Sequence, residues 1–308
     1  MTAAAQTALL HRVGAGALDW LDANRARFRA RTGPHTPAAE VKERFKPVGE
    51  LGLIGSVVRR EGVVGRRQNE QLSKLLDFAW HDVLDSGGLL AWLQDQEPFS
   101  PVPLELYVPF HELGYRHPAV EEHTRLVQAT TAWGVLEAQP NRRLGISRFE
   151  ARAGLTPATP TAEALRRTWL GRTPEPWAVD YHTAYAVTHT VFHLTDWGRS
   201  PDRLPDNIAR YVELWLPAWI DEWRHAEHWD LLGELLVVDA CLPRPALHPD
   251  VWQRYAAAQS PDGAMPIQRG MPVGDPDDVF DVVHHPTLVA LLASAMATSR
   301  SLAALGAP

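Results

Sequence analysis

The stretch Tyr255–Ala297, YAAAQSPDGAMPIQRGMPVGDPDDVFDVVHHPTLVALLASAMA, carries the clearest structural pattern in the chain. A run of alanines ends at Gln-Ser-Pro-Asp-Gly, and Pro and Gly in such a cluster mark a turn. A loop rich in Gly and Pro follows. From Asp278 onward, apolar residues recur at helical spacing. The stretch therefore predicts a helix, a turn, a loop and a second helix.

The same helical spacing fills most of the 308 residues, and alternating runs of β-branched residues are scarce. The sequence predicts an all-α protein. The predicted helices are Ala3–Arg31, Pro37–Phe45, Asn69–Leu84, Gly88–Gln96, Pro103–Tyr115, Pro118–Glu137, Thr161–Leu170, Pro176–Trp197, Pro205–His225, Trp229–Cys241, Pro249–Gln259 and Asp278–Leu302. Residues 46–66 are rich in Gly and Val and predict a short hairpin or irregular flap. Gln139–Pro160 is predicted to be a long loop.

Successive helices alternate in character, which predicts a layered arrangement. Pro205–His225 is highly charged, whereas the following Trp229–Cys241 is apolar with few polar residues. A helical pair of this kind cannot bury its apolar face alone, so a closed ring of pairs is expected. We expect a single helical domain over residues 1–308, with N-terminal helices and the flap in 1–66 and the main ring in 67–308.

The turn Gln259–Gly263, followed by a loop and an apolar helix, resembles the repeat unit of the α/α toroids of terpene cyclases and protein prenyltransferases. The resemblance implies a barrel of paired inner and outer helices. Ala264-Met265-Pro266 departs from the Gly-rich, aromatic end of that turn motif. Taken whole, the chain also resembles uncharacterised actinobacterial proteins that share a THxxFxxTDxG helix, a resemblance that carries no function with it.

The composition limits the classes of partner that the protein is expected to bind. The formal net charge is −7 and no run of Lys and Arg exceeds two residues, so nucleic-acid binding is not expected. The single cysteine, Cys241, excludes intrachain disulfides and fits a reducing cytoplasm. No uninterrupted apolar stretch reaches 18 residues, so no membrane span is expected. The 12 tryptophans are either core filler or the lining of an aromatic cavity for a small apolar substrate.

One helix, Tyr181–Gly198, aligns three histidines and an aspartate. At 100° per residue His182, His189, His193 and Asp196 fall within about 60° of arc, and Tyr185 lies beside them. His189 and His193 are at i and i+4, a spacing at which two imidazoles can chelate one metal ion. Asp196 is placed to complete that site. Zinc is the default ion, and iron suits two histidines and a carboxylate.

The histidine helix has other interpretations. His182 lies about 10 Å along the axis from His189, so it is assigned to substrate contact or proton transfer, with Tyr185. The imidazoles can also act as acids and bases without metal, or serve a structural role only. Candidates from other helices are Asp239, Glu234 and His285 for metal binding, and Trp80, His81, His111 and His284 for substrate binding. A helix cap is the structural alternative for Asp239.

The acidic run GDPDDVFD contains Asp275, Asp277, Asp278 and Asp281. DPDD resembles the DxDD motif of class II terpene cyclases, and that resemblance makes Asp277 the acid that protonates an alkene or epoxide. DDVFD resembles the DDxxD motif of class I enzymes, which holds magnesium on diphosphate. Aspartates at a helix start also cap amides and oppose the helix dipole, which is the structural interpretation.

Several common active-site motifs are missing. The sequence has no phosphate-binding loop, GxGxxG, GxSxG or HExxH. The first hypothesis is therefore an enzyme of bacterial specialised metabolism with a His/Asp site inside a toroid, acting by cyclisation, elimination or rearrangement. The alternatives are a metal-free cyclase that uses Asp277, and a non-catalytic protein that binds a small molecule. The oligomeric state is not predicted.

Overall fold

The computed structural model describes residues 2–29 and 44–306. Within these residues the regular elements are all helices and no strand occurs, which confirms the all-α prediction. Most of the predicted helix Pro37–Phe45 lies outside the described residues.

The chain forms two compact units. The first consists of Met1–Asn24, Val57–Leu72 and Trp169–Pro308, and the second of Arg25–Ser56 and Ser73–Thr168. Helices α3 (Lys46–Glu61) and α4 (Arg66–Phe78) contribute residues to both. The division predicted between residues 66 and 67 falls inside the first unit. The predicted toroid requires the helices of the whole chain to close into a ring, and it stays a prediction.

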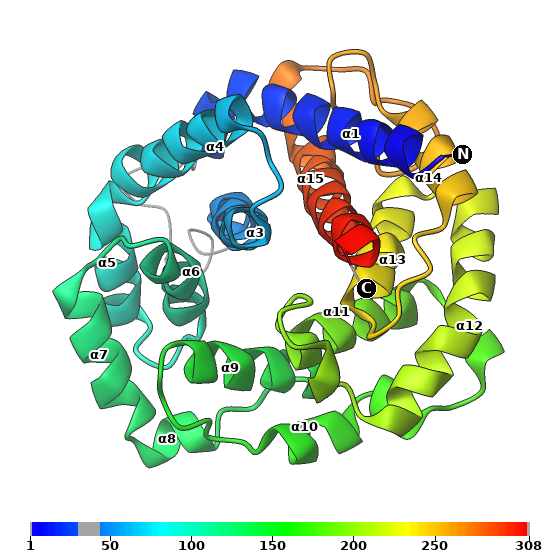
Figure 1. The fold of residues 1–308 in the computed structure, drawn as a ribbon. Coiled ribbons are helices and arrows are strands. Elements are labelled where there is room, and N and C mark those ends of the chain that lie inside the picture. Colours follow the sequence, from blue (N-terminus) through cyan, green and yellow to red (C-terminus); the bar gives the residue numbers. More distant parts are fainter. Residues whose placement is uncertain (1, 30–43, 307–308) are drawn as a thin grey trace. The chain divides into compact units, whose positions relative to one another are not determined.

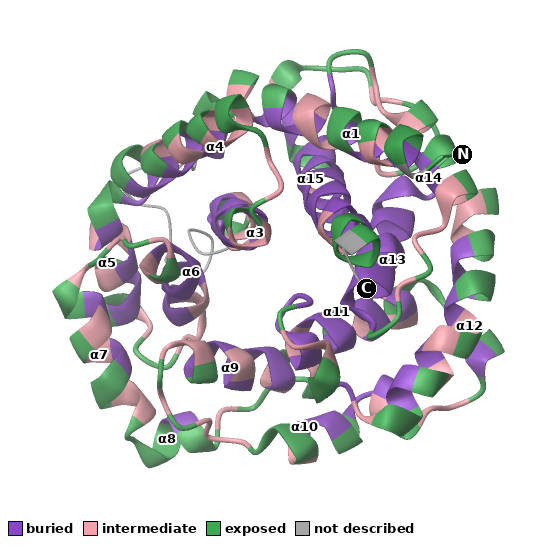
Figure 2. Cartoon of the chain, in the orientation of Figure 1, coloured by how far each residue is buried: buried purple, intermediate pink, exposed green. Residues whose placement is uncertain are grey.

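The first unit is built around helix α15, which packs along α1 and α13 (Figure 1). Both α13 and α15 are largely buried, whereas α12 carries an exposed polar face (Figure 2). By length and composition α15 could cross a membrane, but 67% of its apolar window is buried inside the protein. The main helices of this unit are α1 (Ala3–Ala23), α11 (Tyr181–Thr195), α12 (Asp206–His225), α13 (Trp229–Cys241), α14 (Pro249–Ala258) and α15 (Pro276–Gly306).

The Gln-Ser-Pro-Asp-Gly turn connects α14 to α1. The side chain of Gln259 donates to the carbonyls of Val13 and Gly263, at 3.0 and 2.9 Å. Gly263 has φ +100°, and a Cβ there would lie 2.0 Å from the carbonyl oxygen of Gly16. Only glycine combines this backbone conformation with so close an approach. The predicted turn is confirmed, and its local role is to hold the α14–α15 connection against α1.

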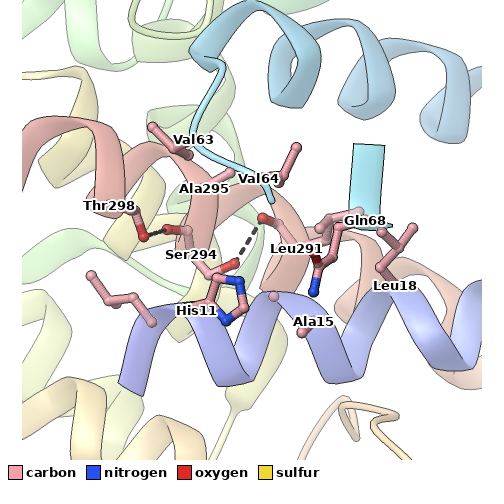
Figure 3. A pocket seen from close by; sticks show the side chains of 12 residues that line it. His11, Ala15, Leu18, Val63, Val64, Gln68, Leu291, Ser294, Ala295 and Thr298 are labelled. Atoms are coloured by element: carbon pink, nitrogen blue, oxygen red, sulfur yellow. Dashed lines mark hydrogen bonds between the residues drawn. The ribbon is translucent and has the colours of Figure 1, made fainter. Parts of the chain in front are cut away.

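A small cavity lies between α1, residues 63–68 and α15 (Figure 3). His11, Gln68, Ser294 and Thr298 give it a polar side, and the hydroxyl of Thr298 is satisfied by the carbonyl of Ser294 at 2.7 Å. Its volume is about 30 Å³. This is room for a water molecule and not for an organic substrate.

Two predictions fail in the second unit and at its edge. Residues 46–66 form helix α3 and the start of α4, not a hairpin or flap. The glycines of α3 permit close packing, since a Cβ at Gly52 would lie 2.5 Å from the ring of Phe110. The predicted loop Gln139–Pro160 contains helix α9, because Pro140 opens a helix as readily as it interrupts one. The helices of this unit are α5 (Gly88–Gln96), α6 (Val102–Glu112), α7 (Pro118–Gln128), α8 (Thr131–Gly134), α9 (Pro140–Arg152) and α10 (Thr161–Arg167).

Glu105 in α6 is a buried carboxyl group with one unsatisfied oxygen. Its Oε2 accepts from Arg142, whereas its Oε1 has no hydrogen-bond partner. Burial raises the pKa of Glu105 to about 7, although Arg142 opposes the rise. A raised folded pKa means that the contribution of Glu105 to stability is full below pH 4.5 and is lost as the pH rises to about 7.

Glu105→Gln is therefore expected to stabilise the protein by about 1 kcal/mol at pH 8 and to change little below pH 4.5. Glutamine keeps an acceptor for Arg142 and removes the buried charge. Urea unfolding at pH 8 and pH 4 measures the difference, and Glu112→Gln, at a partly exposed carboxylate that pairs with Arg152, is the control. Equal effects at both pH values would contradict the prediction.

Candidate functional site

Helix α13 is buried along its whole length yet carries three carboxyl groups, Asp230, Glu234 and Asp239. Buried charges are costly unless partners compensate them, so the partners of these groups locate the polar chemistry of the unit. Asp230 and Glu234 are four residues apart and share one face of the helix. That face meets α11 and α15, which both pack on α13.

Glu234 is held by three side chains. Thr188 on α11 donates its hydroxyl to Oε2. The Nε2 atoms of His189 on α11 and His285 on α15 lie 3.6 and 3.5 Å from Oε1. The Glu234 side chain is only 3% exposed, whereas that of His189 is 48% exposed. A buried carboxylate thus stands behind an imidazole that solvent can reach.

Asp230 extends this arrangement by one helical turn. Its Oδ2 accepts the hydroxyl of Tyr185 on α11, and its Oδ1 lies 3.5 Å from Nε2 of His285. No hydrogen bond reaches Oδ1, although the atom is buried. His285 therefore stands between the two carboxyl groups and contacts both.

These contacts form a series, which we call the relay: His189, Glu234, His285, Asp230 and Tyr185. Within the described part of the chain, no three His, Cys, Asp or Glu side chains are arranged to hold a metal ion. Carboxylate oxygens and imidazole nitrogens alternate from His189 to Asp230 in these contacts. Zinc or iron binding at this face stays a prediction.

The environment drives the pKa values of the two carboxyl groups apart. Burial raises the pKa of Asp230, and the charge of Glu234 adds to that rise against the opposing effect of His285. Burial alone would also raise the pKa of Glu234, but His189 and His285 together lower it below its ordinary value. Burial, with the charge of Asp230, raises the pKa of Tyr185 well above its ordinary value. Neighbouring carboxyl groups with opposite shifts are typical of acid–base sites.

Asp239 has a structural role. Its two carboxylate oxygens accept the backbone amides of Ala246 and Leu247, each at 2.9 Å, and His248 lies 3.5 Å away. These bonds hold the loop that follows α13. The structure therefore favours the capping alternative for Asp239 and not the predicted metal ligand.

His193 and Asp196 lie at the end of α11, away from the contacts of Glu234. The ring of His193 meets the edge of Trp197 at 5.3 Å. Asp196 is the left-handed C-cap residue of α11, and its carboxylate lies 3.9 Å from Arg199. Arg60 donates to the carbonyls of Asp196 and Trp197 at 3.1 and 2.5 Å. The TDxG sequence thus ends the helix.

The remaining predicted residues of the first unit occupy separate places. His182 is exposed on the first turn of α11 and meets Tyr181 edge-on at 5.3 Å. His284 is buried, bonds to the carbonyl of Phe280 at 2.9 Å and stacks on its ring. Asp277 lies partly exposed in the first turn of α15, where its amide donates to Asp275. The acidic run therefore caps α15.

Trp80, His81 and His111 belong to the second unit. Trp80 is buried and packs against the rings of Tyr107, Phe110 and Tyr115, at 5.3–6.0 Å between ring centres. Trp80 is thus part of a hydrophobic core. His81 bonds to Ser86 at 3.0 Å, and His111 lies 3.7 Å from Glu121.

The sequence interpretation missed Asp230, Thr188 and Tyr255. Asp230 opens an apolar helix, where an acidic residue is ordinarily assigned to the helix dipole. The sequence does carry a signal for this site: Asp230 and Glu234 are four residues apart in a segment whose other residues are mostly apolar. The Tyr255 hydroxyl is buried without a hydrogen-bond partner and would lie 2.4 Å from a Cβ at Gly233.

Residues 14–295 match a family model described as a domain of unknown function, DUF6895. The chain belongs to the DUF6895 family. No curated protein and no solved structure matches it. The family assignment covers almost the whole chain, including every residue of the relay.

Proposed function

We propose that this DUF6895 protein is an enzyme that transfers protons through the relay. The observation that carries the proposal is the exposed imidazole of His189 against the buried carboxylate of Glu234. A histidine that a carboxylate orients and stabilises in its charged form is a common general base.

Each member of the relay has a part in this proposal. His189 takes a proton from the substrate, and Glu234 stabilises the imidazolium that forms. His285 joins Glu234 to Asp230. Asp230 is the proposed proton donor, because burial raises the pKa of its carboxyl group, and the hydroxyl of Tyr185 holds that group by a hydrogen bond. A site that removes one proton and supplies another can catalyse elimination, rearrangement or proton-triggered cyclisation.

The substrate proposed for this site is a small molecule with an apolar body. Aromatic rings surround the exposed histidine: Phe192 at 5.9 Å and Tyr185 at 6.4 Å from the His189 ring. Such rings supply rigid apolar contact area. The Asp277 cyclase receives less support, because Asp277 lies at a partly exposed helix start, where its amide donates to Asp275.

Hydrolysis of p-nitrophenyl acetate tests the proposal without knowledge of the natural substrate. An activated imidazole accelerates this reaction as a base or nucleophile. We expect His189→Ala and Glu234→Gln to lower the protein-dependent rate by about tenfold or more. His225→Ala is the matched control, because His225 is an exposed histidine 3.5 Å from an exposed carboxylate, Asp221, away from the relay.

Equal rates in the wild type, His189→Ala and His225→Ala would contradict the proposal. The zinc and iron content of the same preparations, measured by inductively coupled plasma mass spectrometry, tests the metal hypothesis in parallel. If each chain binds one ion, and His189→Ala loses both the ion and the esterase rate, the site is a metal site and not a proton relay. An esterase rate that survives removal of bound metal supports the relay.

A further inference from the structure

Three rings meet at the start of α11 and form what we call the aromatic corner: Tyr181, Trp223 and His228. Their centres are 5.4–6.4 Å apart, and each pair of ring planes is inclined by 60–77°. Rings inclined in this way present a face and an edge to one another.

The aromatic corner is accessible and adjoins the relay. Tyr181 is 44% exposed, and Trp223 is partly exposed. The Tyr181 ring lies 5.1 Å from the ring of Tyr185, whose hydroxyl bonds to Asp230. On the other side, His228 caps the start of α13, two residues before Asp230. A molecule held against these rings would therefore lie beside the acidic end of the relay.

The charge at this end of the relay is negative. Asp230 contacts Tyr185 and His285, and the carboxylate of Glu234 lies one helical turn away on the same face of α13. Glu234 is ionised, and a buried oxygen of Asp230 has no hydrogen-bond partner. Burial also lowers the pKa of His228, which keeps this ring neutral at physiological pH. An anion would be repelled here and a cation attracted.

We propose that the aromatic corner binds an organic cation of the ammonium class and holds it beside the relay. Faces of Tyr and Trp attract cations through their quadrupoles, and sets of such rings recognise quaternary ammonium groups. Asp230 and Glu234, on the helix that His228 caps, add charge complementarity. The organic cation would be the substrate of the proposed enzyme. That role rests on the proposed function, whereas binding of the cation does not.

Choline and its neutral isostere 3,3-dimethylbutan-1-ol test the charge requirement. The two molecules have the same shape and differ in the central atom of the trimethyl group, which is charged only in choline. Isothermal titration calorimetry on the full chain is expected to give choline an affinity about tenfold higher. Tyr181→Leu and Trp223→Leu are each expected to weaken choline binding about fivefold or more.

Trp177→Leu is the matched control, because Trp177 is a 79% exposed tryptophan outside the aromatic corner, and this variant should bind choline like the wild type. Circular dichroism and thermal unfolding verify that each variant is folded. Equal affinities for choline and the alcohol, or no choline binding up to about 100 mM, would overturn the proposal. If His189-dependent ester hydrolysis persists in that case, only the substrate class is wrong.

Discussion

Replacement of Glu234 by glutamine is expected to lower the free energy of unfolding by about 1–3 kcal/mol at pH 7. Glu234 is 3% exposed, and two imidazoles and a hydroxyl surround its carboxylate. Glutamine has nearly the same shape but leaves His189 and His285 without their anionic partner. Contacts to a charged group are worth more than contacts to a neutral one, so their loss lowers stability although solvent reaches His189.

The dependence on pH gives this prediction a second, independent measurement. The folded pKa of Glu234 is lowered, so its contribution to stability is present above its ordinary pKa of 4.5 and is lost as the pH falls below that value. The difference between wild type and Glu234→Gln in urea unfolding should therefore shrink from pH 7 to pH 3. Glu222→Gln, at an exposed carboxylate of α12, should differ from wild type by less than about 0.5 kcal/mol. A Glu234→Gln variant as stable as Glu222→Gln would show that the histidines do not pair with Glu234 in solution.

Much of the helical order could be predicted, because Pro, Gly and capping residues mark the helix ends. Gly88–Gln96 and Trp229–Cys241 agree with α5 and α13 at both ends. The errors arise where Gly or Pro lies within or at the start of a helix and does not mark a loop. The glycines around Gly52 in α3 predict a flap by composition, but they allow close contact with other helices. Pro140 favours a loop in the sequence pattern, but it begins α9.

The candidate site could be predicted only in part. Helical spacing correctly places Tyr185 and His189 on one face of α11, and both are in the relay. The same spacing cannot tell where the helix ends, and Asp196 is its C-cap. Spacing within one helix also carries no information on the opposite helix. The partners that decide the chemistry, Asp230 and Glu234, lie on α13 and are brought to α11 only by packing.

Asp230→Asn is expected to raise the free energy of unfolding by about 1–3 kcal/mol at pH 7, opposite in sign to Glu234→Gln. The folded pKa of Asp230 is raised, so its contribution to stability is full below its ordinary pKa of 3.8 and is lost as the pH rises. Asparagine retains an oxygen for the Tyr185 hydroxyl and removes the buried charge. Urea unfolding should show the gain at pH 7 and its disappearance near pH 3.

Asp239→Asn on the same helix is the matched control. Both carboxylate oxygens of Asp239 accept backbone amides, so an asparagine amide loses one bond and should cost about 1–3 kcal/mol. A loss of stability in both variants would mean that Asp230 is a structural anchor like Asp239. A more stable Asp230→Asn variant with a reduced esterase rate is the outcome expected of a functional residue, because sites that hold reactive groups give up stability to do so. The two carboxyl groups of α13 that face the relay would then have opposite effects on stability, because burial raises the pKa of Asp230 whereas the two histidines lower the pKa of Glu234.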